Sequence, residues 1–364
     1  MANYPVDPTN PAEPTNARAA GYAAEELRAI KGYLQTLVPS NANRSRNRFC
    51  NGAFTFDQRG LGAAFTINSA AETRTLDCFV GTGRVAGGAF TVQQLSTGGP
   101  VGSPTFVRCT VATADAAIPS GAAYWTRALL EGRNTDDLGW GAAGALPVSI
   151  GFWFRSSITG TFSGSVQNAN ATRSYPVSWT YPIANVWQFI TLPNIPGDIT
   201  GTWPTTNVRS MNINFCLGAG TAAVGPADVW AAAGHLGVTG TTNLMATLGA
   251  TFDMALLQFE AGTACTPFEW TPISVGLARV RRYLQTNAYI IRSEAVVTGS
   301  IQQWIPFDTP MRTTPTMSLP NVSYTNANSG NWFNANSFGA ELNCTVTSVG
   351  GFMIISGLVA GAEL

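Results

Sequence analysis

Charged residues are scarce in this sequence. Asp, Glu, Lys and Arg make up 11% of its 364 residues, against ~25% in ordinary globular chains. The formal net charge is zero, and Lys31 is the only lysine. A neutral chain has no electrostatic footprint for nucleic acid or for an anionic membrane surface. We therefore expect no nucleic-acid partner.

Long apolar runs are also missing. The sequence contains no window of about 18 apolar residues that could span a bilayer. Its N-terminus lacks the charged and then apolar pattern of a signal peptide. These absences predict a soluble product, made in the cytoplasm of its host, without membrane insertion.

Histidine occurs once, as His235, which leaves little room for nucleophilic or metal chemistry. No P-loop, strand-linked GxGxxG or HExxH motif is present. We expect no cofactor and no metal. Glycoside hydrolysis by two carboxylates remains the one enzymatic route to weigh, but the sequence pairs none of the available acids, so we expect no catalytic residues and no enzyme. Those acids are Asp136, Asp137, Asp198, Asp253, Glu260 and Glu269.

The six cysteines are far apart, and none forms a CxxC pair. A zinc site is therefore not expected, and free thiols are the default in so large a chain. Disulfide bonds are the alternative, since the number of cysteines is even.

Short strands separated by turn signals recur from Phe90 to Leu257, which predicts a mainly β protein with a sandwich. The segment Val148–Arg155 alternates apolar and small or polar residues, and so does Met211–Gly218. Such a period of two predicts strands with one buried face. The segment Tyr175–Tyr181 alternates as well, and Pro176 places it at a sheet edge.

The N-terminal region reads differently. Residues 1–17 contain four prolines and few apolar side chains, so they should run extended and be held by a partner or be disordered. Residues 18–37 then carry apolar side chains at steps of three and four, a narrow seam typical of a coiled coil, with packing on its own domain as the alternative. The seam consists of Ala20, Ala23, Leu27, Ile30, Leu34 and Leu37. A similar spacing recurs at Ile273, Leu277, Val280 and Leu284.

Several short motifs resemble those of tail-fibre and appendage proteins of tailed bacteriophages. A strand ending in Gln258, Glu260 and Gly262 is followed by Ala264, Thr266–Glu269 and the pair Arg282-Tyr283. Asn51–Gly60 resembles the opening of such a module, and we call it the opening motif. Thr75–Phe79 resembles a later strand of the same module, although Cys78 and Phe79 replace the usual Arg and Trp. Arg281 departs from the usual Cys or Ala before the Arg-Tyr pair. Pro310–Thr316 and the terminal AGAEL also resemble the last module of such fibres.

The resemblance implies a jelly-roll module similar to carbohydrate-binding modules, in a homotrimer on the virion. The N-terminal segment, residues 1–17, would contact other virion proteins. The implied trimer interface comprises Leu27, Ile30, Leu34, Leu37, Leu277 and Val280. The expected domains are an N-terminal anchor and trimerising helix (1–40), a jelly-roll β-sandwich (41–270), a short axial helix as linker (271–288) and a C-terminal β module (289–364).

Aromatic and amide side chains supply the candidate binding site. Sugar rings present apolar faces that stack on aromatic planes, while Asn and Asp side chains bond their hydroxyls; an ordinary sandwich core is the alternative. The outward-facing Trp153 is the favoured residue of the sandwich. A predicted tip loop, Asn321–Phe338, is the second candidate region, because exposed aromatics in a polar loop mark contact surfaces. The candidate glycan-binding residues are Trp153, Trp179, Trp203, Asn168, Asn170 and Trp332.

These observations predict a structural virion protein, a tail or collar fibre, that docks through its N-terminus and recognises host-surface glycan. A tailspike that depolymerises polysaccharide is the main alternative. A head or collar decoration protein without receptor binding is the other.

Overall fold

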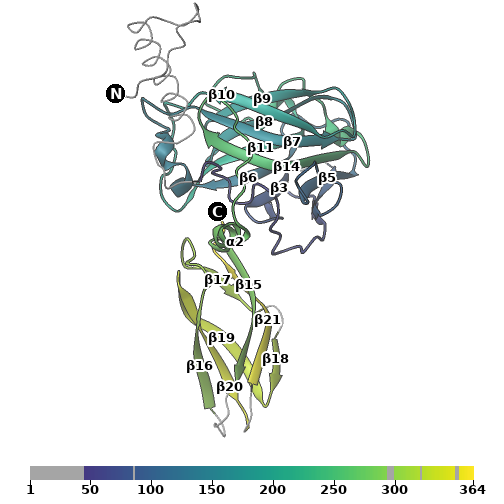
Figure 1. Cartoon of the computed structure of the whole chain (residues 1–364). Coiled ribbons are helices and arrows are strands. Elements are labelled where there is room, and N and C mark those ends of the chain that lie inside the picture. Colours follow the sequence, from purple (N-terminus) through teal and green to yellow (C-terminus); the bar gives the residue numbers. More distant parts are fainter. Residues whose placement is uncertain (1–44, 85–86, 293–298, 320–321, 349–351) are drawn as a thin grey trace, which may run out of the picture. The chain divides into compact units, whose positions relative to one another are not determined.

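The computed structural model describes residues 45–84, 87–292, 299–319, 322–348 and 352–364. The chain divides after Arg46 into two units, of which residues 47–364 form the larger. The predicted segment 1–17 and the predicted seam with Leu27, Ile30, Leu34 and Leu37 lie outside the described residues. Within the described residues the chain is mainly β, which confirms the predicted fold class (Figure 1).

Twelve strands form two six-stranded antiparallel sheets. An interior strand of sheet A is β14 (Thr251–Ala261), which carries Gln258 and Glu260 of the motif Gln258–Glu269, called here the closing motif. In spatial order, the strands of sheet A are β1 (Phe65–Ile67), β4 (Ala89–Leu95), β5 (Phe106–Thr113), β14, β7 (Val148–Ser156) and β10 (Gln188–Ile195).

Sheet B faces sheet A across the core. Between β5 and β14, the chain crosses between the sheets repeatedly, with β8 and β9 as a hairpin in sheet B, which is the connectivity of a jelly roll. The predicted edge strand Tyr175–Tyr181 is β9, and it does lie at the edge. In spatial order, the strands of sheet B are β2 (Thr73–Arg74), β3 (Phe79–Arg84), β6 (Ala123–Glu131), β11 (Arg209–Ala219), β8 (Gly160–Asn168) and β9 (Ser174–Tyr181).

The alternating residues meet in one core between the sheets. Phe152 and Phe154 of β7 are fully buried, and the ring of Trp179 lies edge-on to both, 5.3 and 5.5 Å between centroids. Phe215 of β11 and Phe252 of β14 join the same cluster. Aromatic pairs in such edge-on geometry add to the stability that burial of their area provides.

Short elements complete the sandwich. A parallel pair, β12 (Val224–Gly225) and β13 (Gly237–Val238), forms sheet C in the long connection from β11 to β14. Single-turn helices occur at Gly132–Asn134, Asp136–Leu138, Thr221–Ala223 and Leu244–Ala246.

The C-terminal module has two smaller sheets with their own buried clusters. Its first strand begins at Leu284, so the predicted linker 271–288 contains α2 (Ile273–Arg281) and the start of this strand. Sheet D comprises β15 (Leu284–Arg292), β21 (Phe352–Gly361), β17 (Thr316–Ser318) and β18 (Val322–Thr325). Sheet E comprises β16 (Gly299–Pro306), β20 (Gly339–Val346) and β19 (Ala327–Asn336).

Helix α2 turns its apolar seam toward its own chain. Val280 is 0% exposed and packs in the sandwich core, and Leu277 is partly buried against the same core. The Val280 side chain is therefore not free to form the expected trimer interface, because the core of its own chain buries it. The apolar side chains that α2 exposes are Ile273 (65%) and Val275 (46%), and Trp270 (56%) precedes them.

The Arg-Tyr pair of the sequence fixes the end of α2 to the sandwich. Glu131, at the end of β6, is 1% exposed and accepts two hydrogen bonds from Arg282, at 2.6 and 2.8 Å. The hydroxyl of Tyr283 donates a third at 2.7 Å. Burial next to Glu131 raises the pKa of Tyr283, so this hydroxyl keeps its proton.

The opening motif, Asn51–Gly60, also stabilises the fold. The Asn51 side chain donates to the carbonyls of Phe56 and Asp77, which joins the motif to the segment before β3. Cys50 and Cys78 form a disulfide bond across the same junction. The default expectation of free thiols is therefore wrong for this pair, since the fold brings two distant cysteines together, whereas Cys109, Cys216, Cys265 and Cys344 are free.

Asp77 makes stability depend on pH. Burial raises the pKa of Asp77 to about 6, although hydrogen bonds from the backbone and side chain of Gln58 oppose the shift. The unfolded chain has a carboxyl pKa near ~3.9, so the folded state holds this proton more tightly. The resulting stabilisation is present below about pH 4 and is lost as the pH rises through about 6.

Between pH 4 and pH 7, the wild type should lose about 2 kcal/mol of unfolding free energy through the ionisation of Asp77. Asp77→Asn should not show this loss, because the amide does not ionise. Urea unfolding of both proteins across this range measures it, with the exposed Asp228→Asn as control. Parallel pH profiles for the wild type and Asp77→Asn would contradict the assignment.

Candidate functional site

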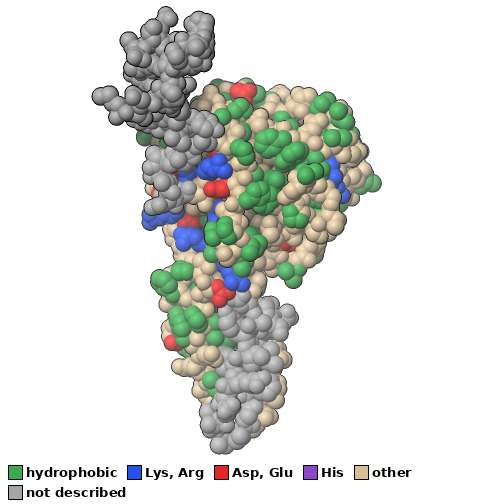
Figure 2. Space-filling view, viewed as in Figure 1, with side chains coloured by type: hydrophobic (Ala, Val, Ile, Leu, Met, Phe, Trp, Pro, Cys, Tyr) green, Lys and Arg blue, Asp and Glu red, His purple; other side chains and the backbone are tan. Residues whose placement is uncertain are grey.

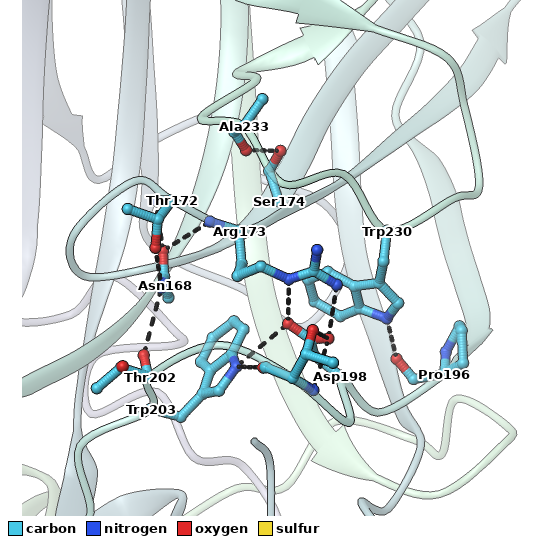
Figure 3. A network of polar contacts seen from close by, with 11 residues as sticks. Asn168, Thr172, Arg173, Ser174, Pro196, Asp198, Thr202, Trp203, Trp230 and Ala233 are labelled. Atoms are coloured by element: carbon cyan, nitrogen blue, oxygen red, sulfur yellow. Dashed lines mark hydrogen bonds and ion pairs between the residues drawn. The ribbon is translucent and has the colours of Figure 1, made fainter. Parts of the chain in front are cut away.

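Three of the predicted glycan-binding residues are buried. Trp179 and Trp203 are 6% and 7% exposed, and Asn168 is 0% exposed. The Asn168 side chain closes the turn between β8 and β9, because its oxygen accepts from the backbone of Thr172 and Arg173 (Figure 3). Its nitrogen donates to Thr172 Oγ1 and the Thr202 carbonyl. These three side chains build the core and its loops, and burial leaves them no face for a ligand.

Trp203 belongs to a network around Asp198 (Figure 3). Arg173 donates two hydrogen bonds of 2.7 Å to this 1% exposed carboxylate, and the Trp203 indole donates a longer one. Burial opposes ionisation of Asp198, but the bonds from Arg173 and Thr200 outweigh it and hold its pKa below the usual range. Trp230 donates to the Pro196 carbonyl beside the network. The network joins the β8–β9 turn, through Arg173, to the β10–β11 connection, through Asp198, and to Trp230 of the β11–β14 connection. The predicted glycan-binding residue Asn170 is exposed in the β8–β9 turn.

The outward side of sheet A carries a further group of aromatic side chains. Trp153 points away from the core because Phe152 and Phe154 on either side point into it. Phe189 of β10 lies directly opposite Trp153, with 5.7 Å between ring centroids, and is 44% exposed. We call Trp153, Phe189, Trp187 and Phe106, with Arg108 and Arg155 among them, the aromatic face.

Part of the outward side of sheet A is covered. A bulge between Ala255 and Gln258 of β14 places Leu256 at φ 50° and lets it pack on this side, with Ala53 and Phe268. The covering segment is held by the closing motif: Glu260 accepts from the backbone and hydroxyl of Thr266, both at 2.6 Å. Phe268, next to Pro267, packs with Leu256 on the outward side of sheet A, so this segment covers a face of the sheet. Trp153 and Trp187 are partly buried against this same cluster, whereas Phe189, on the edge strand β10, is 44% exposed.

Figure 2 shows how the surface is divided. Most of the Arg, Asp and Glu side chains on the face in view gather in one band, and a few lie apart from it at the edges of the sandwich. Hydrophobic side chains gather over the sandwich around the place where β7 and β14 are labelled in Figure 1. A surface of this kind suits a ligand that offers both apolar faces and hydroxyl groups.

The predicted tip loop Asn321–Phe338 is largely strand, so that prediction is wrong. It forms β18 and β19, which are joined at Asn326 with φ 47°. Trp332 points into the module and is partly buried between its two clusters. The opposite side of sheet E carries Trp304 (43% exposed) and Phe333, both paired in register with Glu341.

A cavity of about 230 Å³ lies between the segment Asn47–Phe56 and the segment that contains Phe268 and α2. Trp270 and Phe268 line it, together with Glu269 and Arg279. Both charged groups already serve the fold, since Glu269 accepts from the Asn47 backbone and Arg279 donates to the carbonyls of Asn47 and Phe49.

Most of the carboxylates considered for glycoside hydrolysis form ion pairs or hydrogen bonds within the fold. Asp198 and Asp253 are bound by arginines, Asp137 is bound by Arg48, and Glu260 holds the covering segment. Among the residues that the structure describes, no group of three His, Cys, Asp or Glu could hold a metal ion. No helix in this part of the chain is long and apolar enough to cross a membrane.

No protein-family model and no curated protein matches the chain. Among solved structures, the enzymatically active domain of tailspike protein 4 of bacteriophage CBA120 is 14% identical, with a TM-score of 0.30 over 59% of this chain and 21% of that one. A family 11 carbohydrate-binding module from Clostridium thermocellum is 13% identical, with a TM-score of 0.26 over 52% of this chain and 91% of that one.

An arabinose-bound α-L-arabinofuranosidase is similar over 62% of this chain and 29% of its own, at 10% identity and a TM-score of 0.30. The chain thus spans only a minor part of this enzyme and of the tailspike domain. Likenesses this distant say nothing about the function of this chain.

The sequence pattern indicated Trp153 but not the other residues of the aromatic face, Phe106, Phe189 and Arg108. The period of two in β7 places Arg155 on the same side as Trp153, which was the available signal. The other partners lie on strands whose order in the sheet no local pattern reveals.

Proposed function

We propose that this protein is a structural component of a tailed-phage virion, a tail or collar fibre, and that it binds host-surface glycan without cleaving it. The observation that carries the binding function is the aromatic face. Trp153 and Phe189 offer ring surface to solvent on a rigid sheet, where sugar rings can stack. The motifs that resemble phage fibre proteins support the virion role.

The proposal includes a homotrimer and an N-terminal attachment segment, residues 1–17. Weak sites on three chains raise avidity by ~10² or more when their spacing fits the polymer. Trp270, Ile273 and Val275 supply exposed apolar surface beside α2 that a second chain can cover.

Retention on immobilised host-surface polysaccharide tests the binding function. We expect Trp153→Ala to reduce retention at least tenfold, because each chain of the trimer loses its stacking surface. Leu248→Ala removes a 68% exposed side chain elsewhere and should retain wild-type binding.

Trp332→Ala and Trp304→Ala locate the site if it lies elsewhere. Loss of retention in either, with Trp153→Ala unaffected, would move the site to the C-terminal module and contradict the assignment to sheet A. Circular dichroism of each variant verifies that it is folded.

A further inference from the structure

Two arginines share one carboxylate on the aromatic face. Arg108 donates to Asp253 through Nε and Nη2 at 2.7 and 2.8 Å. Arg155 donates through Nε at 2.8 Å, and its Nη2 forms an ion pair with the same Asp253 oxygen at 2.7 Å. Asp253 is fully buried beneath them, whereas the side chains of Arg108 and Arg155 are 32% and 19% exposed. The cluster therefore carries one surplus positive charge, and that charge is on the solvent side.

Aromatic rings hold both guanidinium groups in place. Arg155 lies 4.5 Å from the ring centroid of Trp187 and 5.2 Å from that of Phe106, and Arg108 lies 5.7 Å from the Phe106 ring. The Trp187 indole is itself fixed by a hydrogen bond to the Gly98 carbonyl. Because Nε and Nη2 of each arginine are engaged by Asp253, each Nη1 keeps its two N–H donors for a ligand.

The nearest other acid on this side of β14 is Glu260, and it does not offset the charge. Glu260 is 3% exposed and lies under the covering segment, where Gln258 and Thr266 saturate its oxygens. The open part of the aromatic face thus presents cationic donors beside Trp153, which precedes Arg155 by two residues, about 7 Å, on the same side of β7.

We propose that the aromatic face binds an acidic saccharide, in which a sugar ring stacks on Trp153 and Phe189 while a ring carboxylate of the next residue pairs with Arg108 and Arg155. This inference rests on the proposed glycan binding and names its substrate class. A planar guanidinium suits a carboxylate, and hydrogen bonds between charged partners are stronger than neutral ones. The incoming carboxylate would balance the surplus charge that Asp253 leaves.

The test uses the full chain and four acidic polymers, polygalacturonate, alginate, hyaluronan and polysialic acid, each beside its carboxyl-reduced form. Reduction converts the carboxylate into a neutral alcohol and keeps the backbone, so each pair differs in charge alone. Binding is measured at 50 and 500 mM NaCl for the wild type and for Arg108→Gln, Arg108→Lys and Trp153→Ala. Arg133→Gln, an exposed arginine outside the aromatic face, is the matched control.

We expect at least one acidic polymer to bind tenfold or more tightly than its reduced form, with a preference that weakens at high salt. Arg108→Gln should abolish the preference, Arg108→Lys should keep part of it, and Arg133→Gln should leave it unchanged. A thermal unfolding midpoint for each variant confirms that the chain is folded.

Two results would overturn the inference. Reduced and acidic forms that bind equally would show that the carboxylate is not recognised, and the proposed glycan binding would then stand if binding still required Trp153. A preference that persists in Arg108→Gln would remove the arginine pair from the site. If no polymer bound in either form, the inference and the proposed binding function would both fail.

Discussion

Replacement of Glu131 by Ala is expected to lower the free energy of unfolding by about 3 kcal/mol. The change removes the acceptor of the buried Tyr283 hydroxyl and of Arg282 in one step. Breaking a buried ion pair costs ~3–5 kcal/mol, and the lower value applies because the Arg282 side chain is 35% exposed and water screens its charge. Urea unfolding at pH 7 measures the loss.

Asp308→Ala is the matched control. Asp308 pairs with the adjacent Arg281 at 2.6 Å, but its side chain is 45% exposed. Such surface pairs contribute ~0–1 kcal/mol. Two results would contradict this role of the Arg-Tyr pair in holding β6 to the C-terminal module. The two variants could lose equal stability, or Glu131→Ala could lose less than about 1 kcal/mol.

The wild-type chain is expected to sediment at three times the 38.3 kDa of one chain. The variant Leu27→Asp/Leu34→Asp should sediment as a monomer, because it places charge in the predicted seam of residues 18–37. Ile273→Asp should weaken the trimer as well, since Ile273 is the most exposed apolar residue of α2. Sedimentation equilibrium over a range of concentrations measures all three masses.

Gln35→Asp, which lies outside the seam in the same predicted helix, should remain trimeric. A monomeric wild type would remove the trimer from the proposal and, with it, the avidity on which weak glycan sites would depend.

The strands and the core were predictable from the sequence because a period of two is a local signal. Phe152 and Phe154 point inward and Trp153 points outward, as their alternation predicted. The edge position of β9 also followed from a local cause, since Pro176 cannot donate to a neighbouring strand.

The arrangement of the site depends on pairings far apart in the sequence. Arg108 and Asp253 are separated by 145 residues, and no local pattern joins them. Asn168 and Trp203 were predicted to meet ligand because Asn and Trp are typical of glycan sites, but distant donors and acceptors draw both into the fold. Residue type predicted the chemistry, while burial decided which residues can perform it.

The motifs that resemble phage fibre proteins serve mainly to assemble this fold. Gln258 and Glu260 fix the covering segment, Gln58 binds Asp77, and Arg282 and Tyr283 bind Glu131. Their shared task is to join segments that are distant in sequence. The residues proposed to bind glycan lie outside these motifs.

The central claim is that the aromatic face binds polysaccharide and leaves it intact. The most direct measurement incubates the wild-type protein with host-surface polysaccharide and follows, in one sample, the amount retained and the chain length of the retained polymer. We expect retention of polymer whose length is unchanged. Polymer that is shortened by the wild type would contradict the account and identify the protein as a depolymerase.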